Sequence, residues 1–340
     1  MADKREYNLD IILEMDLGLP VKQCRAVPVS LGNGKTDAVL AIHSNCGEVD
    51  PFTEMFFFPT DTLKMTLFTL KGEVLWQRDL GRGVVPGLWF CPVFAFDLDG
   101  DGIDEIWFVN NPDLDHPLNT KNRTLERVDP MNGLTTGSWP WVTNGKMGWG
   151  SLSHVHRNFI LGGFVKDDPV LVIAQGTYGH MLLRGVNADM STRWEHFVDE
   201  GDAGARGSHM CCISDMDGDG VNEVLWGERC IEFDKGSELF CADRDSYKGH
   251  SDVAIPVLNP QTGKYLLYTC RESDPTAVPR VAAYDAQGNR LWGHLEHGHM
   301  DMGWVARIGE NGEKIAYAAR LGKKTAGHDG FFRDGLEPFT

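Results

Sequence analysis

The sequence predicts an all-β protein, a β-propeller of four-stranded blades with about six repeats in the chain. The first observation is an acidic turn between two short apolar runs, which occurs twice, at 91–111 and at 208–227. The second is that a strand, a turn and a second strand recur at spacings of about 45–65 residues, which is typical of propeller blades. The third is the composition, because 39 glycines and few runs of helical period favour many strands joined by turns.

Length, charge and cysteine content limit the class of protein. A chain of 340 residues, 42% of them hydrophobic, can bury a sizeable core in one large domain or two. A net charge of −17 disfavours nucleic acid and anionic membranes as partners, because both require a basic face. No apolar run reaches the roughly 18 residues that span a bilayer. The start has no apolar signal stretch, which predicts a cytoplasmic protein, or an extracellular one if the start is trimmed. The eight cysteines form no Cys-x-x-Cys motif, and we expect reduced thiols.

The two acidic turns carry the most distinct motif. In each turn an Asp-x-Asp-Gly-Asp-Gly segment is followed, after two residues, by a glutamate that opens the next strand, and the glycines permit a positive φ. Clustered carboxylates are the ligands that Ca²⁺ prefers. We expect one Ca²⁺ at each turn, bound by Asp97, Asp99, Asp101 and Glu105 and by Asp215, Asp217, Asp219 and Glu223. An EF-hand loop would place its glutamate further along. The alternative is an acidic hairpin turn without metal.

Four other segments keep the strand, turn and strand outline without the carboxylates. They are 27–42, 159–174, 253–269 and 304–318. Second hairpins with a tryptophan near the end, at 67–76 and 281–292, complete four strands per unit. The stretch 9–18 resembles a fourth strand that could pair with the last unit and cover its edge. The last unit lacks one outer strand, so we expect either a single propeller domain over 1–340 or one that is incomplete at its C-terminus.

Basic and aromatic side chains recur at one type of position in these units. In a propeller, the segment before a unit's first strand and the segment after its second strand lie on the face opposite the turn between them. The residues in these segments are His43, His156, Arg157, Tyr178, His180, Arg206, His209, Arg229, Lys248 and His250. Because inner-strand loops converge on a central opening, we interpret the set as a candidate site. A transition-metal site is an alternative with few carboxylates to support it, and a serine hydrolase is disfavoured because no Gly-x-Ser-x-Gly segment occurs.

The order of these motifs resembles the family 11 polysaccharide lyases, which are rhamnogalacturonan lyases built on a calcium-rich, eight-bladed propeller. The likeness runs from 72–81 into 94–105, and then through 176–178 and 209–227 to 249–252. The acidic turns alone are less specific, because they are of the FG-GAP type that integrin-like propellers share. The sequence departs from the family at Val155-His-Arg157, Ser208-His209 and Gly249-His-Ser-Asp252. The family's small β-domain and C-terminal blades have no counterpart in this sequence.

The resemblance implies a lyase that cleaves a uronate polymer, rhamnogalacturonan or a pectin-like chain, by β-elimination. Such a reaction removes the proton on C5 and expels the sugar at O4, so it requires a neutralised carboxylate, a base and an acid. We expect His209, Tyr178 and His180 to supply base and acid, in an order left open, and Arg206, Arg229 and Lys248 to face the carboxylate. Further substrate contacts are expected from His250, His156, Arg157 and His43. The partner is then an acidic polysaccharide or oligosaccharide. The alternative is a non-catalytic, calcium-stabilised propeller that binds carbohydrate or protein.

Overall fold

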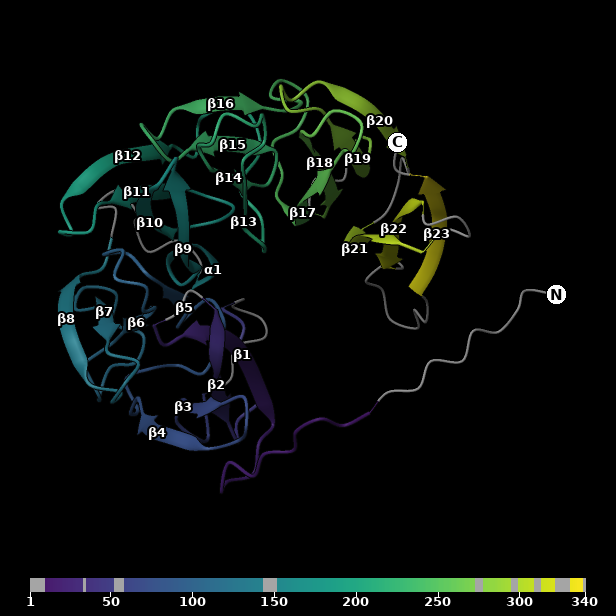
Figure 1. The fold of residues 1–340 in the computed structure, drawn as a ribbon. Helices are drawn as coiled ribbons and strands as arrows, with labels where there is room; N and C mark the ends of the chain where they lie inside the picture. The colour runs from purple at the N-terminus through teal and green to yellow at the C-terminus, as the bar shows by residue number, and fades with distance from the viewer. Residues whose placement is uncertain are drawn as a thin grey trace. The chain divides into compact units, whose positions relative to one another are not determined.

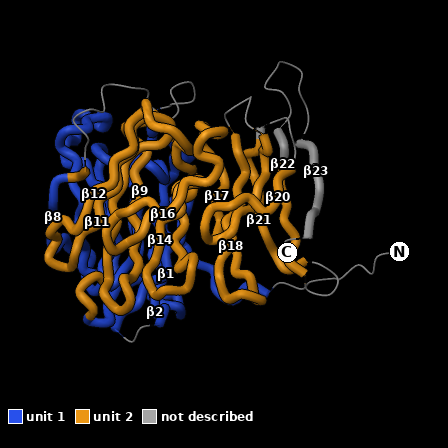
Figure 2. The backbone as a smooth tube through the Cα atoms, turned by 90° about the horizontal axis from the view of Figure 1, so that it is seen from above, with its two compact units in different colours: residues 1–49, 57–97, 101–140 blue, residues 50–56, 98–100, 141–340 orange. Residues whose placement is uncertain are grey.

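The computed structural model describes residues 10–32, 35–51, 58–142, 152–272, 278–294, 299–308, 313–321 and 331–338. The chain divides into two compact units, of which unit 1 comprises residues 1–49, 57–97 and 101–140 and unit 2 comprises residues 50–56, 98–100 and 141–340 (Figure 2). The expectation of a single domain stays a prediction. None of the described helices is long and apolar enough to cross a membrane.

Unit 1 contains two four-stranded antiparallel sheets whose strands follow one another in chain order (Figure 1). The first sheet consists of β1 (Gln23–Ser30), β2 (Thr36–Ser44), β3 (Lys64–Thr69) and β4 (Val74–Asp79). The second consists of β5 (Val93–Phe96), β6 (Glu105–Asn110), β7 (Thr124–Val128) and β8 (Thr135–Pro140). Inner strands such as β3 are almost wholly buried, whereas the outer strands β4 and β8 are exposed at alternate residues. Leu40, Met65 and Phe108 lie in one buried apolar cluster of this unit.

In the part of unit 2 that the structure describes, there are four antiparallel sheets and one short helix, α1 (Leu152–Val155). The first two sheets consist of β9 (Asn158–Val165), β10 (Asp168–Gln175), β11 (Met181–Val186) and β12 (Thr192–Val198), and of β13 (Cys212–Ser214), β14 (Glu223–Trp226), β15 (Arg229–Glu232) and β16 (Glu238–Cys241). The other two consist of β17 (Ser251–Leu258), β18 (Tyr265–Arg271), β19 (Val281–Tyr284) and β20 (Arg290–His294), and of β21 (His299–Arg307), β22 (Lys314–Leu321) and β23 (Phe331–Pro338).

The strand order confirms the predicted all-β class with four-stranded units. Each of the six predicted hairpins forms the first two strands of its own sheet, and five of the sheets have four strands. The sixth has three strands in the described part of the chain, because the segment 331–338 supplies the third. The cysteines are all free, and five of the eight are buried, as expected for reduced core thiols.

The prediction of a strand at 9–18 is wrong. Its described part, 10–18, forms no strand. Instead, Leu13 and Met15 lie 3.0 Å from the position that a side chain at Gly72 would take, at the turn between β3 and β4. The apolar side chains therefore pack on this turn, and the segment does not add a strand to the last sheet.

A repeated contact, here called the aromatic clasp, joins successive sheets within each unit. An aromatic ring on the fourth strand of one sheet covers a glycine in the turn between the third and fourth strands of the next sheet. The pairs are Trp76 with Gly133, Trp194 with Gly236, and Phe240 with Gly288. A Cβ atom at Gly236 would lie 2.4 Å from the Trp194 ring, and φ at Gly236 is 69°. Only glycine meets both conditions without strain.

Candidate functional site

Tyr178 and His209 meet in unit 2 although they are 31 positions apart. Tyr178 follows β10 and has a φ of 76°, in the left-handed region that few non-glycine residues adopt. Its amide donates a hydrogen bond to the carbonyl oxygen of Arg206, which fixes it beside the segment that leads into β13. The Tyr178 hydroxyl lies 2.6 Å from Nε2 of His209. The predicted proximity of these two side chains is therefore confirmed.

His209 is also part of a compact group of two histidines and two carboxylates, here called the His/carboxylate quartet. Its members are His209, His250, Asp252 and Glu272, whose potential ligand atoms all lie within 4.8 Å of one another. Nδ1 of His209 is 3.2 Å from Oδ1 of Asp252, and Nε2 of His250 is 3.4 Å from the same oxygen. Nε2 of His250 also contacts Oε2 of Glu272. Two imidazoles and two carboxylates are a donor set that suits a divalent cation.

The sequence predicted only half of the quartet, although strand pairing places the other half beside it. His209 and His250 were expected at the site, whereas Asp252 and Glu272 were not. Asp252 lies in β17 next to Ser251, and Glu272 directly follows Arg271 at the end of β18. Ser251 pairs with Arg271 in the β17–β18 register, so both carboxylates lie at the same end of this hairpin. The predicted hairpin therefore contained a usable signal, because carboxylates next to paired strand ends lie close together.

Burial controls the protonation of this site. Burial raises the pKa of Asp252, and the nearby Glu272 carboxylate raises it further. Burial alone would lower the pKa of His250, but its contacts with Asp252 and Glu272 raise it overall. Burial also raises the pKa of Tyr178, so its phenol is protonated at neutral pH. The Tyr178 hydroxyl can therefore donate to Nε2 of His209, whose Nδ1 atom lies 3.2 Å from Oδ1 of Asp252.

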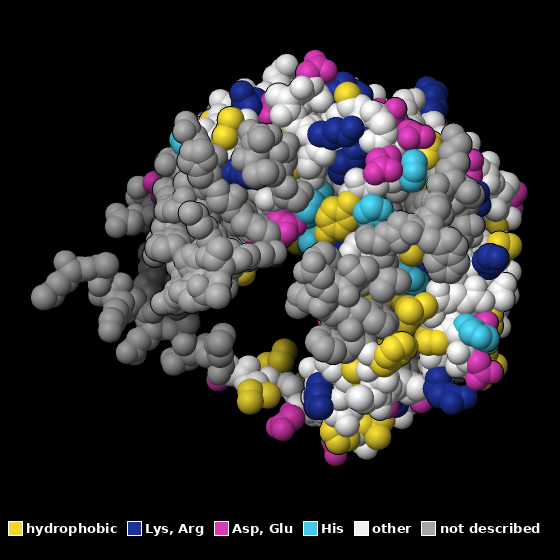
Figure 3. All heavy atoms as spheres, turned by 180° about the vertical axis from the view of Figure 1, so that it is seen from behind, with side chains coloured by type: hydrophobic (Ala, Val, Ile, Leu, Met, Phe, Trp, Pro, Cys, Tyr) yellow, Lys and Arg dark blue, Asp and Glu magenta, His cyan; other side chains and the backbone are white. Residues whose placement is uncertain are grey.

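Other rings and one cation surround Tyr178. Its ring centroid lies 4.2 Å from that of His250 in an edge-on arrangement and 5.9 Å from that of His154. The Arg157 guanidinium lies 5.2 Å from the Tyr178 ring centroid and also pairs with Asp50, at 3.4 Å. Figure 3 shows histidine and acidic side chains gathered on one face, with basic side chains close by.

Two arginines that were predicted to face a substrate carboxylate are buried against protein carbonyl groups. The Arg206 guanidinium donates to the carbonyl oxygens of Asp199 and Glu200 at 2.6 and 2.7 Å. The Arg229 guanidinium donates to the carbonyl of Ala205 at 2.8 Å and pairs with Glu238. Both side chains therefore brace the loop that precedes β13.

The remaining predicted residues occupy varied positions. Lys248 is exposed and His156 is buried. His180 stacks on Phe197 and lies 3.7 Å from the Asp199 carboxylate, so its contacts are outside the quartet. His43 belongs to unit 1, where its Nε2 atom is 2.9 Å from the Thr66 hydroxyl oxygen within the first sheet.

The two acidic turns have matching geometry. In the second turn, Asp215 accepts hydrogen bonds from the amides of Asp219 and Gly220 at 3.1 and 3.0 Å. In the first, Asp97 accepts from the amides of Asp101 and Gly102 at 3.1 and 2.8 Å. The three aspartates of each turn bring one oxygen apiece to within 4.8 Å of one another. This oxygen-only donor set fits Ca²⁺.

The predicted glutamates of the turns also contact groups other than the aspartates. Oε2 of Glu223 accepts a hydrogen bond from the amide of Met216 at 2.7 Å and is buried. Oε1 of Glu105 lies 3.8 Å from the Arg127 guanidinium. The structure thus brings together the three aspartates of each turn. Burial and the charges of Asp217, Asp215 and Asp219 raise the pKa of Glu223 to about 8, so this glutamate lies close to the aspartates of its turn.

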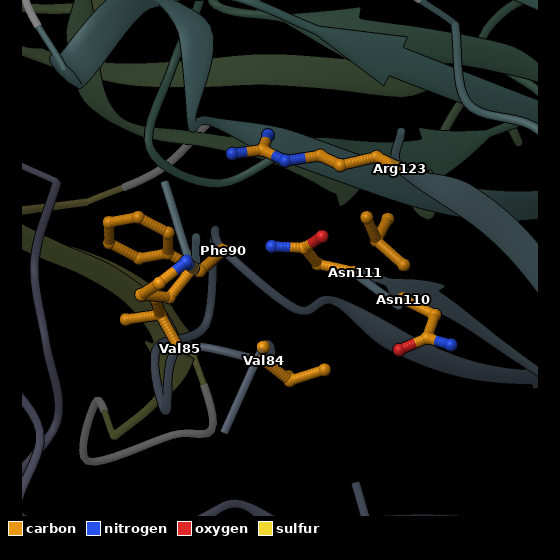
Figure 4. Close-up of a pocket in the computed structure, with 9 residues that line it drawn as sticks. Val84, Val85, Phe90, Asn110, Asn111 and Arg123 are labelled. Atoms are coloured by element: carbon orange, nitrogen blue, oxygen red, sulfur yellow. The ribbon is translucent and has the colours of Figure 1, made fainter. Parts of the chain in front are cut away.

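Unit 1 has a small pocket, which is lined by residues of the segment 83–90 and by Asn111 and Arg123 among others. Figure 4 shows Arg123 and Asn111 on one side of it and Val84 and Val85 on the other. Arg123 is buried, and burial lowers its pKa to about 10. None of the predicted catalytic residues lines this pocket.

The fold and the site together define an all-β, propeller-like protein with a tyrosine, a histidine pair and two carboxylates in one cluster. Residues 160–326, just under half of the chain, match the model of the rhamnogalacturonan lyase family 11, C-terminal domain. The match includes Tyr178, His209 and the rest of the quartet. It supports the resemblance to family 11 that the motifs indicated.

Two curated relatives and two solved structures agree with this match. The chain is 25% identical to the rhamnogalacturonan exolyase YesX of Bacillus subtilis (strain 168), over 72% of this chain and 44% of the relative. It is 24% identical to the rhamnogalacturonan endolyase YesW of the same organism, over 73% and 44%. The crystal structure of YesX gives a TM-score of 0.72 at 20% identity, over 92% of this chain and 55% of that one. The Bacillus licheniformis rhamnogalacturonan lyase PL11 gives 0.70 at 18% identity, over 87% and 55%.

The structural likeness establishes the fold that this chain shares with these proteins. The chain spans less than half of the length of the curated relatives that it matches.

Proposed function

We propose that this chain is a polysaccharide lyase that cleaves a uronate-containing polymer of the rhamnogalacturonan or pectin class by β-elimination. The observation that carries the proposal is the 2.6 Å contact between Tyr178 and His209, at the edge of the His/carboxylate quartet. The names of the relatives supply the class of polymer.

The reaction needs three functions. A base takes the proton from C5 of the uronate, the C4–C5 double bond forms, the bond from C4 to O4 breaks, and an acid protonates O4. Tyr178 and His209 supply the acid and the base, because a half-buried protonated phenol can donate and a neutral imidazole can accept near pH 7. The order of the two roles stays open. A divalent cation held by His250, Asp252 and Glu272 would neutralise the uronate carboxylate and lower the barrier to removing the C5 proton.

The exposed Lys248 is the predicted cation that remains available to a substrate. It lies in the same segment as His250, two positions before it. Arg206 and Arg229 contribute to the site by fixing the loop before β13, since their guanidinium groups already engage protein oxygens.

We also propose that each acidic turn binds Ca²⁺ as a structural ion. Asp97, Asp99 and Asp101 would hold one ion, and Asp215, Asp217 and Asp219 the other. The second turn follows β13, whereas His209 precedes it, so this ion would lie at the far end of the strand from the catalytic pair.

The test is the ultraviolet absorbance of the new C4–C5 double bond. The full chain would be incubated with rhamnogalacturonan, polygalacturonate and a neutral glucan, in the presence of Ca²⁺ or Mn²⁺. We expect absorbance to increase with a uronate polymer and not with the glucan. No increase with either uronate polymer, from a folded protein loaded with either ion, would overturn the proposal.

A binding protein without catalysis is the second candidate. The observation in its favour is that two of the three cations predicted to face the substrate carboxylate are buried against carbonyl groups. Measurable affinity for rhamnogalacturonan without new absorbance would identify this function.

A further inference from the structure

We propose that Glu228 is a positioning residue that sets the geometry of the His/carboxylate quartet by holding Ser251 and Arg271 together. This inference rests on the proposed function, because it assigns the quartet a role in binding a cation. Glu228 lies in the turn between β14 and β15 and is completely buried.

One carboxylate bridges the two strands that carry the quartet's acids. The Ser251 hydroxyl is 3.0 Å from both oxygens of Glu228, and Nε of Arg271 is 2.8 Å from Oε1 of Glu228. Ser251 and Arg271 are partners in the β17–β18 register. Glu228 therefore fixes both residues of one strand pair from the neighbouring sheet.

Three quartet members are covalent neighbours of these two residues. His250 and Asp252 flank Ser251, and Glu272 follows Arg271. A shift of the Ser251–Arg271 pair would therefore move all three potential ligands at once. The side chain of Glu228 itself is not one of the four ligands, so it acts through the backbone positions of its partners.

The fourth member, His209, depends on the same residue. The amide of His209 donates to the carbonyl oxygen of Ser251 at 3.2 Å, and the amide of Ser251 donates to the carbonyl of Gly207 at 3.1 Å. Ser251 is thus the point where both histidine segments meet, and Glu228 holds its side chain.

The arrangement around Arg271 explains why a carboxylate stands at position 228. Arg271 is completely buried, and its guanidinium also binds Asp243 at 2.8 Å and lies 4.0 Å from the Tyr247 ring centroid. Burying the charge of an arginine is unfavourable unless charged and hydrogen-bonding partners compensate for the lost hydration. Tyr247 in turn donates to the carbonyl oxygen of His250, so the same network reaches the quartet by a second route.

The experiment uses the full chain with Mn²⁺ as the probe. Coordination by imidazole nitrogen gives a nitrogen modulation of the Mn²⁺ electron spin echo, which separates the quartet from the oxygen-only acidic turns. Glu228→Gln keeps the size of the side chain and removes its charge. Ser251→Ala removes only one hydroxyl and leaves the Glu228–Arg271 pair in place, so it serves if Glu228→Gln fails to fold. Leu225→Ala is the matched control, because it opens a cavity in the core of the sheet that adjoins Glu228.

We expect Glu228→Gln and Ser251→Ala to weaken the nitrogen-coordinated Mn²⁺ site by about 10–100-fold, as substitutions behind metal ligands typically do. Leu225→Ala should lower the melting temperature without weakening this site. If both test variants bind Mn²⁺ like the wild type or like the control, Glu228 is only part of a core ion pair and the inference is wrong. If the wild type itself gives no nitrogen signal, the quartet is not a cation site, and the proposed function loses its metal together with this inference.

Discussion

Tyr178 has a backbone conformation that few residues other than glycine adopt without strain. A left-handed φ of 76° brings the Cβ atom close to the following carbonyl oxygen and costs about 1–2 kcal/mol for residues other than glycine. The structure retains it because the amide is bonded to Arg206 and the hydroxyl reaches His209. Strain of this kind is common at functional sites, where the surrounding structure enforces it.

The first prediction concerns this pair. Tyr178→Phe keeps the ring and removes the hydroxyl, so kcat for uronate elimination should fall by about 10²–10⁴, the usual contribution of a general acid or base. His209→Ala should be at least as damaging, because it removes both the partner of Tyr178 and a member of the quartet. The measurement is the initial rate of double-bond formation, with melting temperature as the check on folding. A Tyr178→Phe enzyme with unchanged kcat would remove Tyr178 from the mechanism.

The second prediction concerns Arg206. Its guanidinium donates to carbonyls of the loop before β13 and is buried, so Arg206→Lys should lower stability by about 1–3 kcal/mol through unsatisfied carbonyl groups. The free energy of unfolding in denaturant measures this loss. Lys248→Ala is the comparison, because its exposed ammonium should affect KM and not stability. A rise in KM for Arg206→Lys without loss of stability would restore its predicted role as a substrate contact.

At the scale of single elements, the turns carry most of the specific chemistry. The third prediction uses two glycines of nearly equal φ. Gly263 has a φ of 71° and open space around it, whereas Gly236, at 69°, is covered by Trp194. Gly263→Ala should therefore report backbone strain alone. Gly236→Ala should cost about 1–3 kcal/mol more, because the added methyl group overpacks against the indole. If both variants lose the same free energy of unfolding in chemical denaturation, the Trp194 ring can move aside and the aromatic clasp does not require glycine.

The fourth prediction concerns the acidic turns. Removing Ca²⁺ leaves three carboxylates close together in each turn, and their repulsion should lower the melting temperature. Asp217→Asn should reproduce part of this loss. The measurement is thermal unfolding with and without excess chelator. His250→Ala provides the control, since it disables the quartet and leaves only the turns to respond. If excess chelator leaves the melting temperature of this variant unchanged, the turns do not bind a structural Ca²⁺ ion.

The positions of the strands were easier to predict than the directions and contacts of their side chains. Period and turn residues located both hairpin strands of every unit, and strand order alone brought Tyr178 next to His209. The direction of a long side chain is not encoded by strand order, so Arg206 and Arg229 were expected to face a substrate although they bind nearby carbonyls. Glu272 follows the last residue of β18, and its role depends on register, which the hairpin pattern located only approximately. The 10–18 segment has an apolar pattern like that of a strand, but its side chains pack on the turn beside Gly72.

At the scale of the whole molecule, the fifth prediction tests the expected single domain. Leu40 in unit 1 and Leu225 in unit 2 are both completely buried. Each Leu→Ala change should cost about 2–5 kcal/mol. If the chain unfolds as one domain, both variants shift the same calorimetric transition, and its enthalpy matches the van't Hoff value. Two transitions that respond separately to the two variants would instead make the units independent domains.

The aromatic clasp gives the series of sheets a direction. In each of the three pairs the ring belongs to the earlier sheet and the glycine turn to the later one. Every sheet that takes part in two clasps, as the β13–β16 sheet does through Gly236 and Phe240, therefore has one side that receives a ring and another that provides one. The contact between successive sheets is therefore head-to-tail. Two sides that both carry a ring, or both carry a glycine turn, cannot form a clasp. A sheet inserted between two others would need a glycine turn on one side and an aromatic ring on the other to form both clasps.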